Sequence, residues 1–130
     1  MKIDKDFLDN LIVQAQQSER KRMNYDLRTS PKDGGQRMLN ALLPETSIPI
    51  HCHPMSNESV IVLQGEMDEI LYDSKGIEIG RIRLNPANGQ YGYVVPQGVW
   101  HTVEVHTPSV IYEAKDGKYG QDGSVNLDIK

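Results

Sequence analysis

The sequence is poor in the features that mark secreted and membrane proteins. Its 130 residues include a single cysteine, Cys52, so no intrachain disulfide and no thiol-rich metal site can form. No apolar run approaches the roughly 18 residues of a membrane span, and the N-terminus lacks the apolar core of a signal peptide. These absences predict a cytoplasmic protein without a membrane partner, in which any metal is held by nitrogen and oxygen.

An excess of basic residues is also absent. The chain has 14 lysines and arginines against 18 acidic residues, a formal net charge of −4. There is therefore no global positive field to attract nucleic acid or an anionic membrane, and neither is expected as a partner. A hydrophobic fraction of 38% with 25% charged residues is ordinary for one globular domain of this length.

The N-terminal segment has the pattern of one amphipathic helix. Over residues 5–17 the apolar side chains recur at the spacing of a single helical stripe, and Asp4 or Asp6 can cap the start. Basic and turn-rich residues follow up to residue 35 and predict a connector. We therefore expect a helix and connector over residues 1–35, ahead of a main unit over 36–130, within a single domain overall.

From residue 36 onward the pattern changes to short β-type segments separated by Pro, Gly, Asn and Asp. The segments are 36–43, 47–53, 58–64, 66–72, 77–84, 91–95, 100–105 and 109–114. This rhythm predicts an all-β sandwich or barrel. The stretch from 116 to 130 is rich in Gly and Asp and is expected to be a surface tail, or an edge strand through Val125, Leu127 and Ile129.

Two motifs carry potential metal ligands. The first, His-x-His-x4-Glu-x6-Gly, contains His51, His53 and Glu58, and the second, Pro-x-Gly-x2-His, ends at His101. Residues i and i+2 of a strand face the same side, so His51 and His53 present two imidazoles together while Cys52 points to the back. The intervening turn returns Glu58 toward the same point, and His101 arrives from a later strand. Three imidazoles and one carboxylate suit Fe, Mn, Ni, Cu or Zn.

These are the two motifs of the cupin superfamily, which the chain resembles. The resemblance implies a double-stranded β-helix, or jelly-roll, barrel with a short N-terminal helix, and one divalent metal ion held by the four residues named above. Two departures affect loop geometry: Gln90 stands where the second motif often has Gly, and Val105 where it often has Asn.

The stretch from about residue 20 to 119 further resembles the WbuC-type cupin metalloproteins found with bacterial surface-polysaccharide genes. The shared segments are 22–25, 36–42, 51–58, 96–102 and 113–119. Arg28 departs from the pattern, because a His is expected there. The resemblance implies a role near surface-polysaccharide metabolism, with a sugar, a sugar nucleotide or a small hydroxy or keto acid as the ligand.

Further residues are candidates for ligand binding. On a regular strand Arg37 and Asn40 face opposite sides, so only one can face inward; an inward Arg would bind a carboxylate or phosphate. Tyr93 and Tyr112 could stack on a sugar ring, or could be core or dimer packing. Glu113 and Lys115 could move a proton. Further expectations are apolar walls at Val60, Val62, Val99 and Val103, an exposed His106, and Arg22 either solvated or folded over the barrel mouth.

Two functions fit these features. The first is a metal-dependent enzyme, such as an isomerase, epimerase, lyase or dioxygenase. The second is a non-enzymatic module that binds or senses a small molecule. An open metal position beside an unpaired acid or base would favour the enzyme. Because a small barrel has exposed strand edges, we also expect a homodimer.

Overall fold

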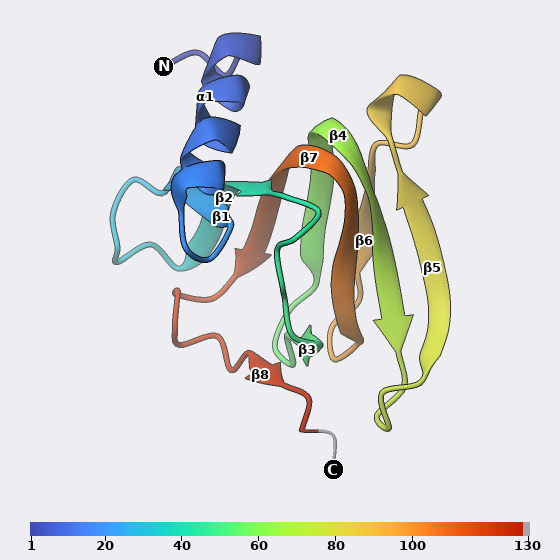
Figure 1. The fold of residues 1–130 in the computed structure, drawn as a ribbon. Helices are drawn as coiled ribbons and strands as arrows, with labels where there is room; N and C mark the ends of the chain where they lie inside the picture. Colours follow the sequence, from blue (N-terminus) through green and yellow to red (C-terminus); the bar gives the residue numbers. More distant parts are fainter. Residues whose placement is uncertain (129–130) are drawn as a thin grey trace.

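The computed structural model describes residues 1–128, in which one α-helix packs against a barrel of antiparallel strands (Figure 1). The elements in chain order are α1 (Lys5–Gln17), β1 (Arg22–Asp26), β2 (Gly35–Leu42), β3 (His51–Cys52), β4 (Glu58–Tyr72), β5 (Glu78–Leu84), the 3₁₀ turn η1 (Pro86–Asn88), β6 (Gly92–Val95), β7 (Trp100–Asp116) and β8 (Val125–Asn126). The predicted all-β architecture with a short N-terminal helix is confirmed.

Helix α1 has the predicted bounds. The Asp4 side chain caps it by accepting a hydrogen bond from the Phe7 backbone N–H at 3.0 Å. Its buried side chains pack on the outer face of β2 and β7, where they form a first core. The members of this core are Leu8, Leu11, Ile12, Ala15, Leu39, Ala41, Leu43 and Val110.

A second core fills the barrel itself. It consists of Leu42, Val60, Val62, Met67, Leu84, Val105 and Ile111. Strand β2 serves both cores because successive side chains of a strand alternate between its faces: Leu39 and Ala41 face the helix, whereas Leu42 faces the barrel interior.

The two longest strands form the body of the barrel, and each was predicted as two shorter ones. Strand β4 pairs with β5, β6 and β7, and β7 also pairs with β2 and β3. The β4–β7 register shifts between Val62 and Met67, around Gly65, whose φ is +100°. A β-bulge absorbs the extra residue, so the strand bends without ending. The predicted break at this point is therefore a bend.

Two further segments differ from the sequence-based prediction. The expected connector contains β1, which pairs with β2 along its length and adds a strand to the sheet. The expected strand over 47–53 is regular only at β3, which pairs with β7 and β8. An edge strand near the C-terminus is present at Val125, and Leu127 donates its backbone N–H to Ile50 O; Ile129 lies outside the described residues.

Within residues 1–128, no helix has the length and apolar character needed to cross a membrane.

Candidate metal centre and cavity

The three motif histidines converge at one end of the barrel. His51 lies on β3 and is the register partner of His101, the second residue of β7. His53 follows two residues after His51, so its ring lies on the same side. The ring centroids of His51 and His101 are 4.2 Å apart, and His53 lies 5.0 Å from His51 and 5.2 Å from His101. Each histidine offers a ring nitrogen within 4.8 Å of the other two.

Each imidazole is oriented by an oxygen that contacts its Nδ1. His51 Nδ1 lies 2.9 Å from Pro49 O, and His101 Nδ1 lies 3.0 Å from Val99 O. His53 Nδ1 lies 2.6 Å from Ser124 Oγ, in the segment that precedes β8. A carbonyl oxygen only accepts, so Nδ1 carries a proton in His51 and in His101, and in a neutral ring this leaves the lone pair on Nε2. This is the usual arrangement of metal-ligating histidines.

Glu58, the first residue of β4, completes the set. Its carboxylate lies 3.1 Å from His53 Nε2 and 3.4 Å from His101 Nε2, and it accepts a hydrogen bond from Lys115 Nζ at 3.3 Å. Burial alone would raise the pKa of Glu58, but the two imidazoles and the Lys115 ammonium hold it well below its usual range. The carboxylate is therefore charged and faces the imidazoles.

The pKa values of the imidazoles reflect the same geometry. Burial, with the charge of His101, lowers the pKa of His51 to about 4, so its imidazole is neutral at pH 7. Burial would also lower the pKa of His101, but the interaction of its ring with the Glu58 carboxylate raises it overall. The neutral His51 imidazole can therefore donate an electron pair to a metal, whereas the His101 imidazole is paired with the Glu58 carboxylate.

The donor set fits a transition-metal ion. The Nε2 atoms of His53 and His101 are buried and face the Glu58 carboxylate at 3.1 and 3.4 Å, but neither makes a hydrogen bond of good geometry with any of residues 1–128. Buried polar atoms without partners are rare in native proteins unless they bind an ion, a ligand or water. Three converging imidazoles, two of them beside a buried carboxylate, are ligands that Fe, Mn, Ni, Cu or Zn can accept.

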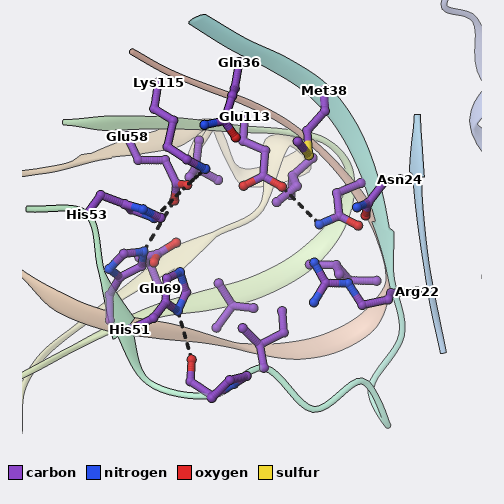
Figure 2. A pocket seen from close by; sticks show the side chains of 18 of the residues that line it. Arg22, Asn24, Gln36, Met38, His51, His53, Glu58, Glu69, Glu113 and Lys115 are labelled. Carbon is purple, nitrogen blue, oxygen red and sulfur yellow. Dashed lines mark hydrogen bonds and ion pairs between the residues drawn. The ribbon is translucent and has the colours of Figure 1, made fainter. Parts of the chain in front are cut away.

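The site opens onto a cavity of about 490 Å³ inside the barrel (Figure 2). Val60, Val103 and Ile111 form part of an apolar wall, and polar side chains occupy the rest. The polar lining residues are Arg20, Arg22, Asn24, Gln36, Asn40, His51, His53, Glu58, Glu69, His101, Glu113, Lys115, Tyr119 and Asn126. A cavity of this size, lined largely by polar and charged side chains, suits a small polar ligand.

Three of the candidate ligand-binding residues line the cavity. Asn40 is buried and donates its amide to Glu113 Oε1 at 3.0 Å, and Lys115 holds Glu58. The other three candidates lie elsewhere. Arg37 faces away from the cavity and pairs with Asp33 at 3.2 Å. Tyr93 packs against the barrel core and Tyr112 against the helix-side core, so both are packing residues.

The four valines expected to form apolar walls divide between the cavity and other positions. Val60 and Val103 line the cavity, whereas Val62 is buried in the barrel core and Val99 is not part of the lining. Cys52 is buried on the back of its strand. His106 is partly buried rather than exposed; its Nε2 lies 3.2 Å from Oδ2 of the buried Asp68, and neither residue lines the cavity.

Glu69 is a cavity residue that the sequence analysis missed. It is 1% exposed, and neither carboxylate oxygen has a hydrogen-bond partner among the described residues. Burial raises the pKa of Glu69 to about 8, so the carboxyl is protonated at neutral pH. Strand alternation continued from Val60 and Val62 would place Glu69 on the outer face. The bulge at Gly65 reverses the alternation and turns Glu69 inward. Arg22, considered as a residue over the mouth, does line the cavity.

Comparison with solved structures shows the cupin fold. An oxalate oxidase in complex with the substrate analogue glycolate is 16% identical, with a TM-score of 0.62 over 85% of this chain and 57% of that chain. CapF with the inhibitor 3-isopropenyl-tropolone is 19% identical, with a TM-score of 0.69 over 86% and 33%. A cupin 2 domain-containing protein from Halorhodospira halophila is 15% identical, with a TM-score of 0.64 over 82% and 70%.

The chain spans 57% of the oxalate oxidase and 32% of an oxalate decarboxylase from Lactobacillus farciminis. No curated protein matches it. A family model described as "Domain of unknown function (DUF6016)" matches residues 3–84, which include the helix, β1 to β5 and three of the four motif ligands. The chain, which has the cupin fold, therefore belongs to the DUF6016 family.

Proposed function

We propose that this protein is a metal-dependent cupin that binds one divalent transition-metal ion through His51, His53, Glu58 and His101. The observation that supports this most directly is the convergence of three imidazoles, whose Nδ1 atoms contact oxygens and which each offer a ring nitrogen within 4.8 Å of the other two. The ion would supply Lewis-acid or redox chemistry to a ligand in the cavity.

The test is metal content by mass spectrometry on protein from its native host. About one equivalent of a single metal is expected in the wild type, and almost none in the His51→Ala/His101→Ala variant. His106→Ala is the matched control, because His106 contacts Asp68 outside the cavity and should leave the metal content unchanged. A wild-type protein without metal, or a double variant that keeps it, would refute the proposal.

We propose an enzyme rather than a binding module. Glu69 is buried, lines the cavity and has no hydrogen-bond partner in the described residues, and its raised pKa lets it hold or release a proton near neutral pH. Glu113 and Lys115 are already engaged with Asn40 and Glu58. The identity of the metal would then select among isomerase, epimerase, lyase and dioxygenase chemistry. Binding of a ligand that the metal-loaded protein never converts would support the binding module.

The ligand class and context are also proposals. A sugar, sugar nucleotide or small hydroxy or keto acid from surface-polysaccharide metabolism is supported by the resemblance to the WbuC-type proteins, whose shared segments 22–25, 36–42 and 113–119 contribute cavity residues. A thermal-shift screen of the metal-loaded protein against these three ligand classes tests it. Stabilisation by none of them would contradict the proposal. The cytoplasmic location stays a prediction.

A homodimer is proposed from the sheet edges. Among the strands of residues 1–128, β5 pairs with β4 alone, and Ile77 and Ile79 at this edge are 59% and 65% exposed. An open edge with apolar side chains can pair with a second copy. Light scattering after gel filtration should give twice the monomer mass of 14.7 kDa. A monomer at micromolar concentration would contradict it.

A further inference from the structure

The Arg22 guanidinium is a positive charge in the cavity that has no ionic partner among residues 1–128. It is the first residue of β1, and its side chain enters the cavity from the side opposite His51 and His53 (Figure 2). Its Nε atom is buried and has no hydrogen-bond partner within the described part of the chain. Among residues 1–128, no carboxylate lies within ion-pair distance of the guanidinium.

The neighbouring charges do not neutralise it. Arg20 also lines the cavity, and burial together with the charge of Arg20 lowers the pKa of the Arg22 guanidinium. Glu58 is taken by Lys115 and the imidazoles. Glu113 accepts the Asn40 amide, and burial raises the pKa of its carboxyl. Both of these carboxyl groups are therefore engaged by other side chains.

Holding a half-buried guanidinium without a partner is costly, because water is lost and no hydrogen bond replaces it. The cost is recovered when a ligand supplies the missing acceptors. A guanidinium presents planar, parallel N–H donors that match the two oxygens of a carboxylate or phosphate. The position of Arg22, across the cavity from the histidines, would fix one end of such a ligand while the other end faces the metal centre.

We infer that Arg22 binds an oxyanion, carboxylate or phosphate, at one end of the small ligand that occupies this cavity. The inference deepens the proposed function by naming a chemical class for the ligand, and the orientation of that ligand rests on the proposed metal centre. The oxyanion site itself is built from Arg22 and its surroundings and does not need the metal.

The test is an NMR titration of the zinc-loaded, isotope-labelled protein with acetate, inorganic phosphate and the neutral acetamide. The resonances to follow are Arg22 Nε–H and the side-chain amides of Asn24 and Asn40, which line the same cavity. Acetate, phosphate or both should give saturable shifts, and acetamide should not. The preferred anion assigns the oxyanion as a carboxylate or a phosphate.

Two variants locate the binding. Arg22→Gln should weaken oxyanion binding about tenfold or more, the usual loss for a charge-assisted hydrogen bond. Arg37→Gln is the matched control, because Arg37 lies on the neighbouring strand but pairs with Asp33 outside the cavity, and it should bind as the wild type does. The absence of saturable shifts with either anion, or equal binding by both variants, would overturn the inference.

Metal content measured on the same samples separates the two proposals. Protein that takes up no metal but binds an oxyanion through Arg22 would refute the metal centre and keep this inference. Protein with a full metal site and no Arg22-dependent binding would keep the metal centre and refute this inference.

Discussion

Gly65 sits where β4 changes its register against β7, and its backbone has a φ of +100°. A Cβ atom at this position would overlap the Ser109 hydroxyl and lie 2.6 Å from Pro108 O. The backbone oxygen cannot move without disturbing β7, so this glycine is required both for its conformation and for the close approach of the two strands.

We predict that Gly65→Ala lowers the free energy of unfolding by about 3 kcal/mol or more, because the strained φ and the overlap both add cost. Gly89→Ala is the control: its φ is +77°, but nothing lies within 4 Å of the added Cβ, so only about 1–2 kcal/mol should be lost. Urea unfolding measures both variants. Equal losses would show that the contact with β7 is unimportant.

Ser124 orients the imidazole of His53 through its hydroxyl group, whereas the Nδ1 atoms of His51 and His101 contact backbone carbonyl oxygens. We predict that Ser124→Ala weakens metal binding about 10–100-fold, as removal of such a partner usually does. Competition with a metal-sensitive dye measures the affinity. Ser74→Ala, in an exposed turn, should bind like the wild type, and an unchanged affinity in Ser124→Ala would rule out an orienting role.

The sequence contained enough to predict His51, His53, Glu58 and His101 as one group, because strand alternation and motif spacing are local. It did not contain enough to place Glu69. The residues that face the barrel interior are even-numbered before the bulge, such as Val60 and Val62, and odd-numbered after it, such as Met67. The bulge depends on the close approach of Gly65 to β7, which is a contact far along the chain.

At the scale of elements, α1 was predictable to the residue, because its apolar stripe and its Asp4 cap are both local signals. Strand β1 was not. The exposed Asn24, Tyr25 and Asp26 give it no alternating apolar pattern, and it forms by pairing with β2. Likewise Pro108, a residue that usually interrupts a strand, lies inside β7, where a register shift accommodates it.

The helix contributes to stability through its buried face. We predict that Leu11→Ala lowers the free energy of unfolding by about 2–5 kcal/mol, because Leu11 is 2% exposed and its removal leaves a cavity between α1 and the sheet. Val13→Ala is the control on the same helix; Val13 is 45% exposed, and its loss should be below about 1 kcal/mol. Thermal unfolding compares them.

The outcome also bears on the division of the chain. If residues 1–35 were a dispensable appendage, Leu11→Ala would melt the helix and leave the barrel transition unchanged. A single cooperative transition that shifts as a whole would instead show that the helix-side core and the barrel unfold together. The division into a helix and connector over 1–35 and a barrel over 36–130, within a single domain overall, stays a prediction until that experiment.

At the scale of the whole molecule, two buried carboxyls oppose each other in the dependence of stability on pH. Burial alone would raise the pKa of Asp68, but Arg81, His106 and Arg83 lower it overall. The charged form is thus favoured by folding, and its contribution is lost as the pH falls below 3.8. Glu69 acts in the opposite direction: its pKa rises from 4.5 to about 8, so folding favours the protonated form.

For Glu69 the dependence of stability on pH therefore has the opposite sign to that for Asp68. The folded state holds a proton that the unfolded state releases, so the free energy of unfolding should fall as the pH rises from 4.5 toward 8. The shift in pKa corresponds to a destabilisation on the order of 4 kcal/mol at pH 8. The effect belongs to the metal-free protein, because a nearby cation would favour the charged carboxylate.

We predict that, in chelator-treated protein, Glu69→Gln is more stable than the wild type at pH 8 and similar to it at pH 4.5. The neutral amide has no proton to lose, so urea unfolding across this range should show a smaller slope with pH; Glu113, whose pKa burial also raises, keeps part of it. Glu66→Gln is the control on the same strand, because Glu66 pairs with Arg83 outside the cavity, and its curve should keep the wild-type slope. If the free energies of unfolding of Glu69→Gln and the wild type ran parallel across this pH range, Glu69 would be charged in the folded protein. That result would contradict its proposed role in proton transfer.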